Sequence, residues 1–541
     1  MFLPNLKFTN MKKIYILDTT LRDGAQTSSV SFTVQDKLTV FKMLEDFGID
    51  FIEAGWPGAN DIDTQVFNQV ESSIKTAFCM TSKVGTEPKN DENLKLVSSL
   101  ANNITMVGKV SQFHVREAIG TKLEKNLESI AASVKFFASQ GKRVIFDAEH
   151  FFDGFKENVE YTLSCVETAW KFGAEFVTLC DTNGGTLPDE IFEIVTKVKA
   201  KFPEMKLGIH THNDCECAVA NTIAAVKAGC EMVQGTINGL GERCGNASLT
   251  SILPILVLKL GFRCGKINEN IHKIAELSRK LSVVLNEHHN NHLPFAGASA
   301  FAHKGGLHAS AVLKNPKLYE QIPPELVGNK RKILISNQAG KSNVVSMLAD
   351  VGITNYLPEH LEKITKELKK RNSEGYSYEN ADASFYILCK HVIKEKSHEF
   401  YKILSYKTQT ERLYNSHGKL CTFSEGVIKI ECNGTVHHNV AEGNGPVDSI
   451  HNAMRKVLIE EYPQIQNLKL HDYKVRIIDS GLGTSSKTLV LIEFMHTQTQ
   501  ENFTTVGVSE NIIEASFQAL NDGIVYFLDF YKIGDTIGKC Q

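Results

Sequence analysis

Two histidines separated by one residue, in the stretch HTHND at 210–214, are the side chains of this sequence best suited to chemistry. The first of them ends the run KLGIH, which reads as a short buried strand. Side chains two positions apart on a strand point to the same face. His210 and His212 can therefore share one divalent metal, in surroundings that Asn213 and Asp214 keep polar. The alternative is an ordinary pair of surface or core histidines, because H-x-H alone is a weak motif.

Two cysteines follow these histidines closely. Cys215 and Cys217 could act as soft metal ligands, but a Cys-x-Cys pair at the start of a helix more often has a structural role. The rest of the chain must therefore supply the missing ligands.

The segment from Lys13 to about Leu260 alternates short β-like runs with longer amphipathic stretches. The predicted strands are Lys13–Leu17, Phe51–Ala54, Ala77–Met80, Ile104–Val107, Arg143–Phe146, Phe176–Leu179, Lys206–Ile209 and Met232–Gln234. The predicted helices include Val34–Phe47, Leu123–Ser139, Val159–Phe172, Pro188–Lys201 and Ala218–Ala228. Eight such βα units in about 250 residues have the size of a (β/α)8 TIM barrel, an α/β fold that we assign to residues 11–275. A doubly wound open sheet is the runner-up, but no Gly-rich dinucleotide fingerprint follows the first strand.

The remainder of the chain is predicted to form two further parts. Beyond Gly261 the periodicity becomes helical, with candidate helices at Ile271–His288, Ser342–Val351 and Pro358–Asn372. Later come strands of alternating polarity and two helices, at Ser405–Thr410, Val427–Cys432, Pro446–Glu460, Asp472–Ile478, Thr488–Phe494 and Asn511–Gly523. We predict helical linker subdomains over 276–398 and a C-terminal α+β domain over 399–541. Residues 1–10 would be a short disordered leader if Met11 is the true start.

Composition restricts the class of partner. The net charge is −3 and no basic stripe with interleaved aromatic residues is visible, so nucleic acid is not an expected partner. No apolar run approaches the length that spans a bilayer, so no membrane association is expected, and the first ten residues lack the apolar core of a secretory signal. The 12 cysteines are scattered without a CxxC pair, which suits reduced thiols in a cytoplasmic protein.

Polar side chains cluster where the predicted barrel strands end, and barrel enzymes carry their chemistry on the loops that follow these ends. The strings DTTLRDGAQ, IEAG, DAEH, CDTNG, HTHND and GLGERCGN occupy these positions. Besides the histidines, they contain Arg22, Asp23, Glu53, Glu149, Thr182 and Asn246. Carboxylates and amides are costly to bury without partners. One or two could be ion pairs or helix caps, but convergence at six of eight strand ends predicts a site.

These strings resemble those of a known family. LDTTLRDGAQ, IEAGWPG, DAEHFFDG, CDTNGG, HTHND and GLGERCGNA are similar to motifs of the metal-dependent acyl-CoA:2-oxo-acid condensing enzymes, which are the isopropylmalate, homocitrate and citramalate synthases. The variants in this chain lie closest to the citramalate synthase branch. The strings GNGPVD at 443–448 and TVGVSENIIEAS at 505–516 resemble the family's regulatory domain. Many relatives have Glu where this chain has Ala25, so any role of that carboxylate is absent here.

The resemblance implies a metal site at the strand ends. Asp23, His210, His212 and Asn246 would hold one divalent metal ion, and a mixed nitrogen and oxygen set with open positions suits Mg, Mn or Zn. A 2-oxo acid can chelate such an ion through its carboxylate and ketone oxygens, which polarises the ketone.

The same resemblance implies roles in binding and catalysis. Arg22 can stabilise the alkoxide that develops when the ketone is attacked, with Glu53 orienting it; the alternative for Arg22 is a surface helix cap. Thr182 resembles the hydroxyl that binds the substrate carboxylate, with helix N-cap as its competing role.

Two candidates remain for the base that removes a proton from the acyl-CoA methyl group. Glu149 is one, either as the base or as the group that positions the hydrolytic water. The other is His308, which together with Tyr319 matches a linker His and Tyr that reach over the partner subunit's active site in the family. Ser310 stands where some relatives have Asp, and a purely structural role is the alternative for His308.

The resemblance further implies that acetyl-CoA, pyruvate and water react to give (R)-citramalate and CoA, the entry step of a threonine-independent route to isoleucine. It implies a homodimer whose C-terminal domain binds an amino-acid effector, isoleucine. The rival within the class is 2-isopropylmalate synthase, because one methyl or methylene group discriminates by only ~1–3 kcal/mol. A metal-dependent lyase and a non-catalytic amino-acid sensor are rivals from other classes; the linker argues against the first and the intact metal ligands against the second.

Overall fold

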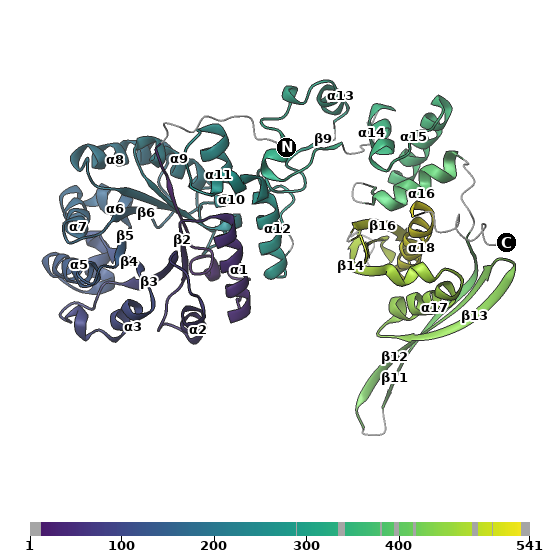
Figure 1. Cartoon of the computed structure of the whole chain (residues 1–541), viewed down its shortest axis with the longest axis horizontal. Helices are drawn as coiled ribbons and strands as arrows, with labels where there is room; N and C mark the ends of the chain where they lie inside the picture. Colours follow the sequence, from purple (N-terminus) through teal and green to yellow (C-terminus); the bar gives the residue numbers. More distant parts are fainter. Residues whose placement is uncertain are drawn as a thin grey trace. The chain divides into compact units, whose positions relative to one another are not determined.

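The computed structural model describes residues 12–287, 289–303, 305–333, 341–378, 381–393, 400–414, 418–478, 485–499 and 501–531. The predicted leader, residues 1–10, lies outside the described residues. The chain forms two compact units, one made of residues up to Ala302 with Glu320–Arg331, the other of His303–Tyr319 and the residues from Lys332 onward (Figure 1). Across the described ranges, no helix combines the length and the apolar character needed to cross a membrane.

The first unit contains a closed barrel of eight parallel strands, which confirms the predicted fold. Strand β1 pairs with both β2 and β8, and this pairing closes the sheet. The strands are β1 (Tyr15–Asp18), β2 (Phe51–Gly55), β3 (Lys75–Met80), β4 (Asn103–Lys109), β5 (Arg143–Glu149), β6 (Phe176–Asp181), β7 (Leu207–Thr211) and β8 (Met232–Gly235). Several strands continue beyond their predicted ends because polar residues such as Asp147 and Asp181 stay in the ladder.

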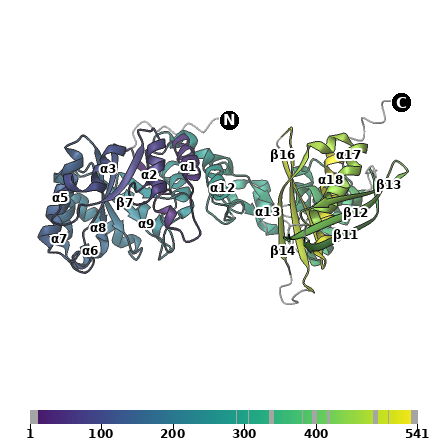
Figure 2. The ribbon, with the colours of Figure 1, turned by 90° about the horizontal axis from the view of Figure 1, so that it is seen from below.

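Helices surround these strands, as Figures 1 and 2 show. Thr33 forms a capping box with Asp36 at the start of α1, and Gly48, with a φ of 101°, ends it in the left-handed conformation. The short α4 runs directly into a π-helical turn at Val115–Ile119. The helices are α1 (Val34–Phe47), α2 (Asp61–Gln69), α3 (Glu92–Leu100), α4 (Gln112–His114), α5 (Leu123–Ala138), α6 (Phe151–Glu157), α7 (Val159–Lys171), α8 (Pro188–Lys201), α9 (Ala218–Ala228) and α10 (Leu249–Pro254).

The barrel interior is apolar where the strands begin and polar where they finish. Its apolar layer consists of Leu17, Phe51, Ile145, Phe176 and Met232. Because side chains two positions apart on a strand share a face, the next inward layer consists of Thr19, Glu53, Asp147, Thr178 and Gln234, all of them buried. These five residues form a polar layer beneath the candidate site, which we call the polar floor of the barrel.

The segment that follows the barrel departs from the prediction. One helix was expected over Ile271–His288, but residues 271–273 form a separate 3-10 turn and α12 (Ile274–Val284) ends early. Asn286 has a φ of 54°, a left-handed conformation that cannot continue a helix. His288 lies outside the described residues. The short α11 (Ile267–Asn270) precedes this turn.

The second unit begins with helices and ends with two antiparallel sheets. Helices α14 and α15 share one hydrophobic core with both sheets. Helix α17 packs on the sheet formed by β11, β12 and β13. Helices α16 and α18 pack on the sheet formed by β14, β15 and β16. The elements are α13 (Gly306–Lys314), α14 (Lys341–Asp350), α15 (Pro358–Ser373), α16 (Asp382–Ile393), β11 (Lys402–Tyr414), β12 (Leu420–Cys432), β13 (Thr435–Gly443), α17 (Pro446–Glu461), β14 (Leu468–Ile477), β15 (Thr488–His496), β16 (Glu501–Ser509) and α18 (Ile512–Phe530).

The α+β prediction for this region is confirmed, but details differ. Strands β13 and β16 and helix α16 were not predicted. Helix α18 was expected to stop at Gly523, yet it continues to Phe530. A Cβ on Gly523 would lie 2.1 Å from the Phe494 ring, so this glycine permits close packing of the helix on β15 and does not end the helix.

Candidate active site

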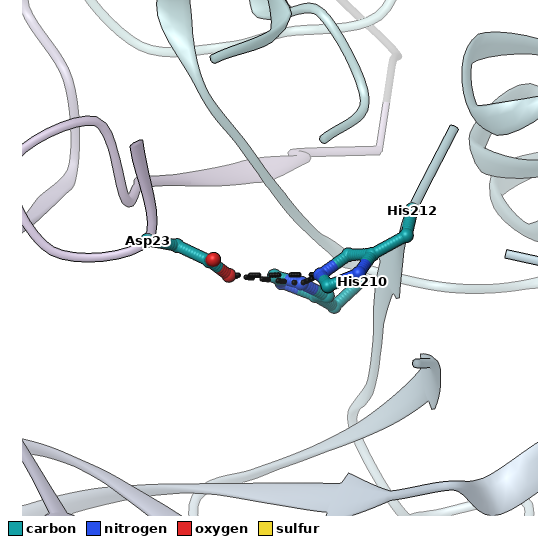
Figure 3. A group of neighbouring side chains, drawn as sticks. All are labelled: Asp23, His210 and His212. Carbon is teal, nitrogen blue, oxygen red and sulfur yellow. Dashed lines mark hydrogen bonds and ion pairs between the residues drawn. The ribbon is translucent and has the colours of Figure 1, made fainter. Parts of the chain in front are cut away.

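Asp23, His210 and His212 converge at the carboxyl end of the barrel strands. In Figure 3 the three side chains point toward one another. Asp23 Oδ2 lies 3.4 Å from His210 Nε2 and 3.7 Å from His212 Nε2, and the two Nε2 atoms are 3.1 Å apart. All three residues are buried, and they form a group able to hold one metal ion. His210 lies on β7 and His212 directly follows it, so the period of two brings the imidazoles together as the sequence predicted.

Asn246 lies next to this group, in the loop after β8. Its backbone forms an isolated antiparallel bridge with His212. Its Nδ2 donates to the Leu240 carbonyl at 3.1 Å, while its Oδ1 is buried without a hydrogen-bond partner. Buried oxygens are rarely left unpaired, so this atom fits a ligand position for a cation. Gly245, with a φ of 89°, makes the preceding turn, where a Cβ would lie 2.0 Å from the Gly239 carbonyl oxygen.

The protonation states of the group suit a cation. Burial, reinforced by His212, lowers the pKa of His210 to about 4 against the opposing effect of Asp23. Burial alone would raise the pKa of Asp23, but Arg22 and the two histidines hold it well below its usual range. At neutral pH the site therefore presents a neutral His210 imidazole and a charged carboxylate, and together with Asn246 these donors fit a divalent ion.

Arg22 is a partly buried cation next to this group and is not a surface helix cap. Its Nε donates to Glu53 Oε2 at 2.7 Å, and its Nη1 lies 3.4 Å from Asp23 Oδ2. The guanidinium carbon lies 4.2 Å from the centroid of the Phe78 ring. Burial favours the neutral form, but Glu53 and Asp23 outweigh it and raise the pKa of Arg22. A fixed positive charge thus stands beside the site, able to stabilise an oxygen that becomes negative.

Two more acids near the site have raised pKa values. Burial raises the pKa of Asp147 to about 8, with Glu53 adding to the effect and a hydrogen bond from Gln234 opposing it. Burial also raises the pKa of Asp18 to about 7 against two hydrogen bonds from Thr20. Because Asp147 keeps its proton near neutral pH, the polar floor of the barrel carries less negative charge than its carboxyl groups suggest.

Thr182 follows β6 and caps no helix, because the N-cap of α8 is Leu187. Its Oγ1 accepts the backbone N–H of His150 at 2.9 Å, which leaves its hydroxyl hydrogen for another acceptor. The Thr182 carbonyl accepts from Arg243 Nη2 at 2.7 Å. Arg243 also donates to Asp214 at 2.7 Å and lies 2.8 Å from His212 Nδ1, so it ties together the loops after β6, β7 and β8.

Glu149 stands at the end of β5, where its Oε2 lies 2.6 Å from Lys109 Nζ at the end of β4. The neighbouring His150 has a φ of 58°, a conformation that non-glycine residues rarely adopt, and its ring stacks on His114 at 3.5 Å between centroids. The candidate base is therefore held by a lysine at the end of β5, directly before the left-handed His150.

His308 and Tyr319 belong to the second unit. His308 lies on α13 and Tyr319 follows a 3-10 turn, and their exposed rings stack at 4.1 Å between centroids with an interplanar angle of 26°. The two predicted residues are therefore in contact with each other.

Sequence reasoning missed the supporting residues of the site. Gln234 lies in a predicted strand and Asp147 directly follows one, and a polar residue at an inward position of a barrel strand is the signal that could have identified them. Cys217 stands at the N-cap of α9, and within the described residues neither it nor Cys215 joins the metal-binding group. This arrangement favours the structural role for that pair.

Three family models match successive parts of the chain. The HMGL-like model matches residues 13–281, the homocitrate synthase post-HMGL domain-like model matches 295–375, and the LeuA allosteric (dimerisation) domain matches 379–528. Together they cover the barrel, the linker and the C-terminal domain in the order expected.

Curated relatives match over nearly the full length. The (R)-citramalate synthase of Aquifex aeolicus is 46% identical over 96% of this chain and 98% of that protein, and the one from Synechocystis is 43% identical over 98% of both. The 2-isopropylmalate synthase of Methanocaldococcus jannaschii is more distant, at 28% identity over 95% of this chain and 94% of that protein. This chain belongs to the (R)-citramalate synthase family.

Proposed function

We propose that this chain condenses acetyl-CoA with pyruvate and water to give (R)-citramalate and CoA. The observation that carries the proposal is identity of 40–46% to five curated (R)-citramalate synthases over at least 95% of the chain, against 28–29% to the 2-isopropylmalate synthases. The chain is thus an acyltransferase in which the acyl group becomes an alkyl group on transfer.

One divalent metal ion, Mg, Mn or Zn, is proposed at Asp23, His210, His212 and Asn246. The convergence of the first three and the unpaired buried Oδ1 of Asn246 support this set. When bound, such an ion acts as a Lewis acid toward the ketone and carboxylate of a 2-oxo acid.

Residues of the barrel are proposed to bind pyruvate and to stabilise developing charge. Arg22, held by Glu53, faces the oxygen that gains negative charge as the new carbon–carbon bond forms. Thr182 donates its free hydroxyl hydrogen to the substrate carboxylate, since its oxygen is already occupied by the His150 N–H.

Two residues are proposed for moving the proton of the acetyl-CoA methyl group. Glu149 is the barrel candidate, and its pairing with Lys109 keeps its carboxylate at the end of β5. His308, stacked on Tyr319, is the candidate that the partner subunit supplies by family resemblance. The turnover of a His308→Ala variant distinguishes their separate roles.

The C-terminal unit is proposed to dimerise the protein and to bind isoleucine as a feedback effector, in a threonine-independent isoleucine pathway. The match to an allosteric dimerisation domain supports this assignment. We place the reaction in the cytoplasm, in keeping with the free thiols of cysteines such as Cys79, Cys165 and Cys230.

The proposal is tested by measuring CoA release from acetyl-CoA with a panel of 2-oxo acids. We expect pyruvate to have the highest kcat/KM and isoleucine to inhibit. A preference for 3-methyl-2-oxobutanoate would establish an isopropylmalate synthase. Cleavage of citramalate or a hydroxyacyl-CoA without net condensation would establish a lyase, and insensitivity to isoleucine would refute the proposed effector.

A further inference from the structure

Gln234 on β8 is a fully buried amide in the barrel interior, directly beneath a metal-binding histidine. Its Oε1 lies 3.0 Å from His210 Nδ1. Its Nε2 donates to Asp147 Oδ1 at 2.7 Å and to Thr178 Oγ1 at 3.0 Å. Each of its polar atoms therefore has a partner, and the three partners come from β5, β6 and β7.

The directions of these hydrogen bonds have a consequence for His210. Asp147 and Thr178 accept the two hydrogens of the Gln234 amide nitrogen, and the amide oxygen is the atom that faces the imidazole. A carbonyl oxygen only accepts, so His210 Nδ1 carries the hydrogen and Nε2 keeps its lone pair. That lone pair lies on the side of Asp23 and His212, where a cation would bind.

We propose that Gln234 is a positioning residue that holds His210 in its metal-binding tautomer and orientation before the metal arrives. The inference rests on the metal site of the proposed function and adds to it a residue outside the ligand set. Partners that bind the second nitrogen of a histidine ligand fix its tautomer and ring orientation, and their loss typically weakens metal binding 10–100-fold.

Asp147 and Thr178 anchor the amide in turn. Gly208 on β7 leaves the space that Thr178 needs, because a Cβ there would lie 2.6 Å from Thr178 Oγ1. The network thus runs from β5 and β6 through β8 to β7, and it holds the Gln234 amide from three other strands.

The test compares Mn²⁺ affinity in calorimetric titrations of the full-length, metal-stripped protein and its variants. Gln234→Leu removes the acceptor and should weaken Mn²⁺ binding about 10–100-fold. Gln234→Glu keeps an acceptor opposite His210 Nδ1 and should restore most of the affinity. The matched control is Gln140→Leu, since Gln140 is an exposed glutamine that bonds to Ser98 on the barrel surface; it should bind as wild type does.

A second readout follows the tautomer directly. With ¹⁵N-labelled histidine, metal-free wild type should show His210 protonated on Nδ1, and Gln234→Leu should lose this preference. Equal Mn²⁺ affinity in wild type and Gln234→Leu would overturn the inference. So would a wild-type His210 protonated on Nε2, and this second result does not depend on how well any variant folds. Neither readout depends on turnover. A protein that binds Mn²⁺ but condenses another oxo acid would therefore refute only the proposed function. Wild-type protein that binds no metal would refute the metal site itself.

Discussion

The substitution Glu53→Gln isolates the charge that holds Arg22 at the site. The Glu53 side chain is fully buried, and its Oε2 accepts from Arg22 Nε at 2.7 Å. Glutamine has nearly the same shape, so it keeps an acceptor in place but removes the negative charge. Arg22 then retains only Asp23, at 3.4 Å, as a charged contact among the described residues.

The expected magnitude follows from the change in this hydrogen bond. A buried bond between charged groups contributes ~1.5–3 kcal/mol and one with a neutral acceptor ~0.5–1.5 kcal/mol, a difference of about 1–2 kcal/mol. If that energy positions Arg22 for the transition state, kcat/KM for pyruvate should fall about 5–30-fold. Arg22 should also move toward Asp23 and draw it from the metal site, so metal affinity should fall in parallel.

The assay is steady-state CoA release at saturating acetyl-CoA and varied pyruvate. Glu45→Gln is the matched control, because Glu45 pairs with the exposed Lys42 away from the site; it should leave kcat/KM unchanged. Thermal unfolding of both variants separates loss of rate from loss of fold. Native kcat/KM in a folded Glu53→Gln variant would refute the role assigned to the pair.

Three further predictions concern the site and its floor. Thr182→Val should lower kcat/KM for pyruvate about 10–100-fold by removing a hydrogen bond to a carboxylate, while Thr182→Ser should retain most activity; equal rates for both variants would contradict the assignment. His308→Ala should lower turnover by about 10²–10⁴ while metal and pyruvate still bind in calorimetry, and near-normal turnover would leave Glu149 as the base. Burial raises the pKa of Asp147 to about 8, so the folded protein keeps a proton that the unfolded chain releases above pH ~4. The free energy of unfolding should therefore fall by ~1.4 kcal/mol for each unit by which the pH rises between about pH 5 and 7. Asp147→Asn should remove that slope, measured by the fluorescence of the barrel residues Trp56 and Trp170, and an unchanged slope would show that Asp147 is ionised.

The barrel and the two histidines of its candidate metal site could be predicted because both follow from local patterns. Alternating apolar strands and amphipathic helices fixed the element order, and a period of two placed His210 and His212 on one face. Asp23 and Asn246 were added to the candidate ligands through the resemblance to the family's motifs, and the strand ends that carry them lie at the same end of a barrel.

The supporting interactions could not be predicted, because they depend on which side chains meet across the barrel. Gln234 meets Asp147 although 87 positions separate them, and Lys109 meets Glu149 only because β4 and β5 are neighbours in register. Helix ends were missed where tertiary packing overrides a local signal, as at Gly523, where the approach of Phe494 explains the glycine.

The central claim is that a metal at the Asp23, His210 and His212 group activates pyruvate for condensation. The most direct measurement is CoA release from acetyl-CoA and pyruvate by protein stripped with a chelator and then titrated with Mg²⁺, Mn²⁺ or Zn²⁺. Activity should vanish on stripping and return in proportion to metal up to one ion per chain, and Asp23→Asn should not recover it. Full activity after complete metal removal would contradict the account.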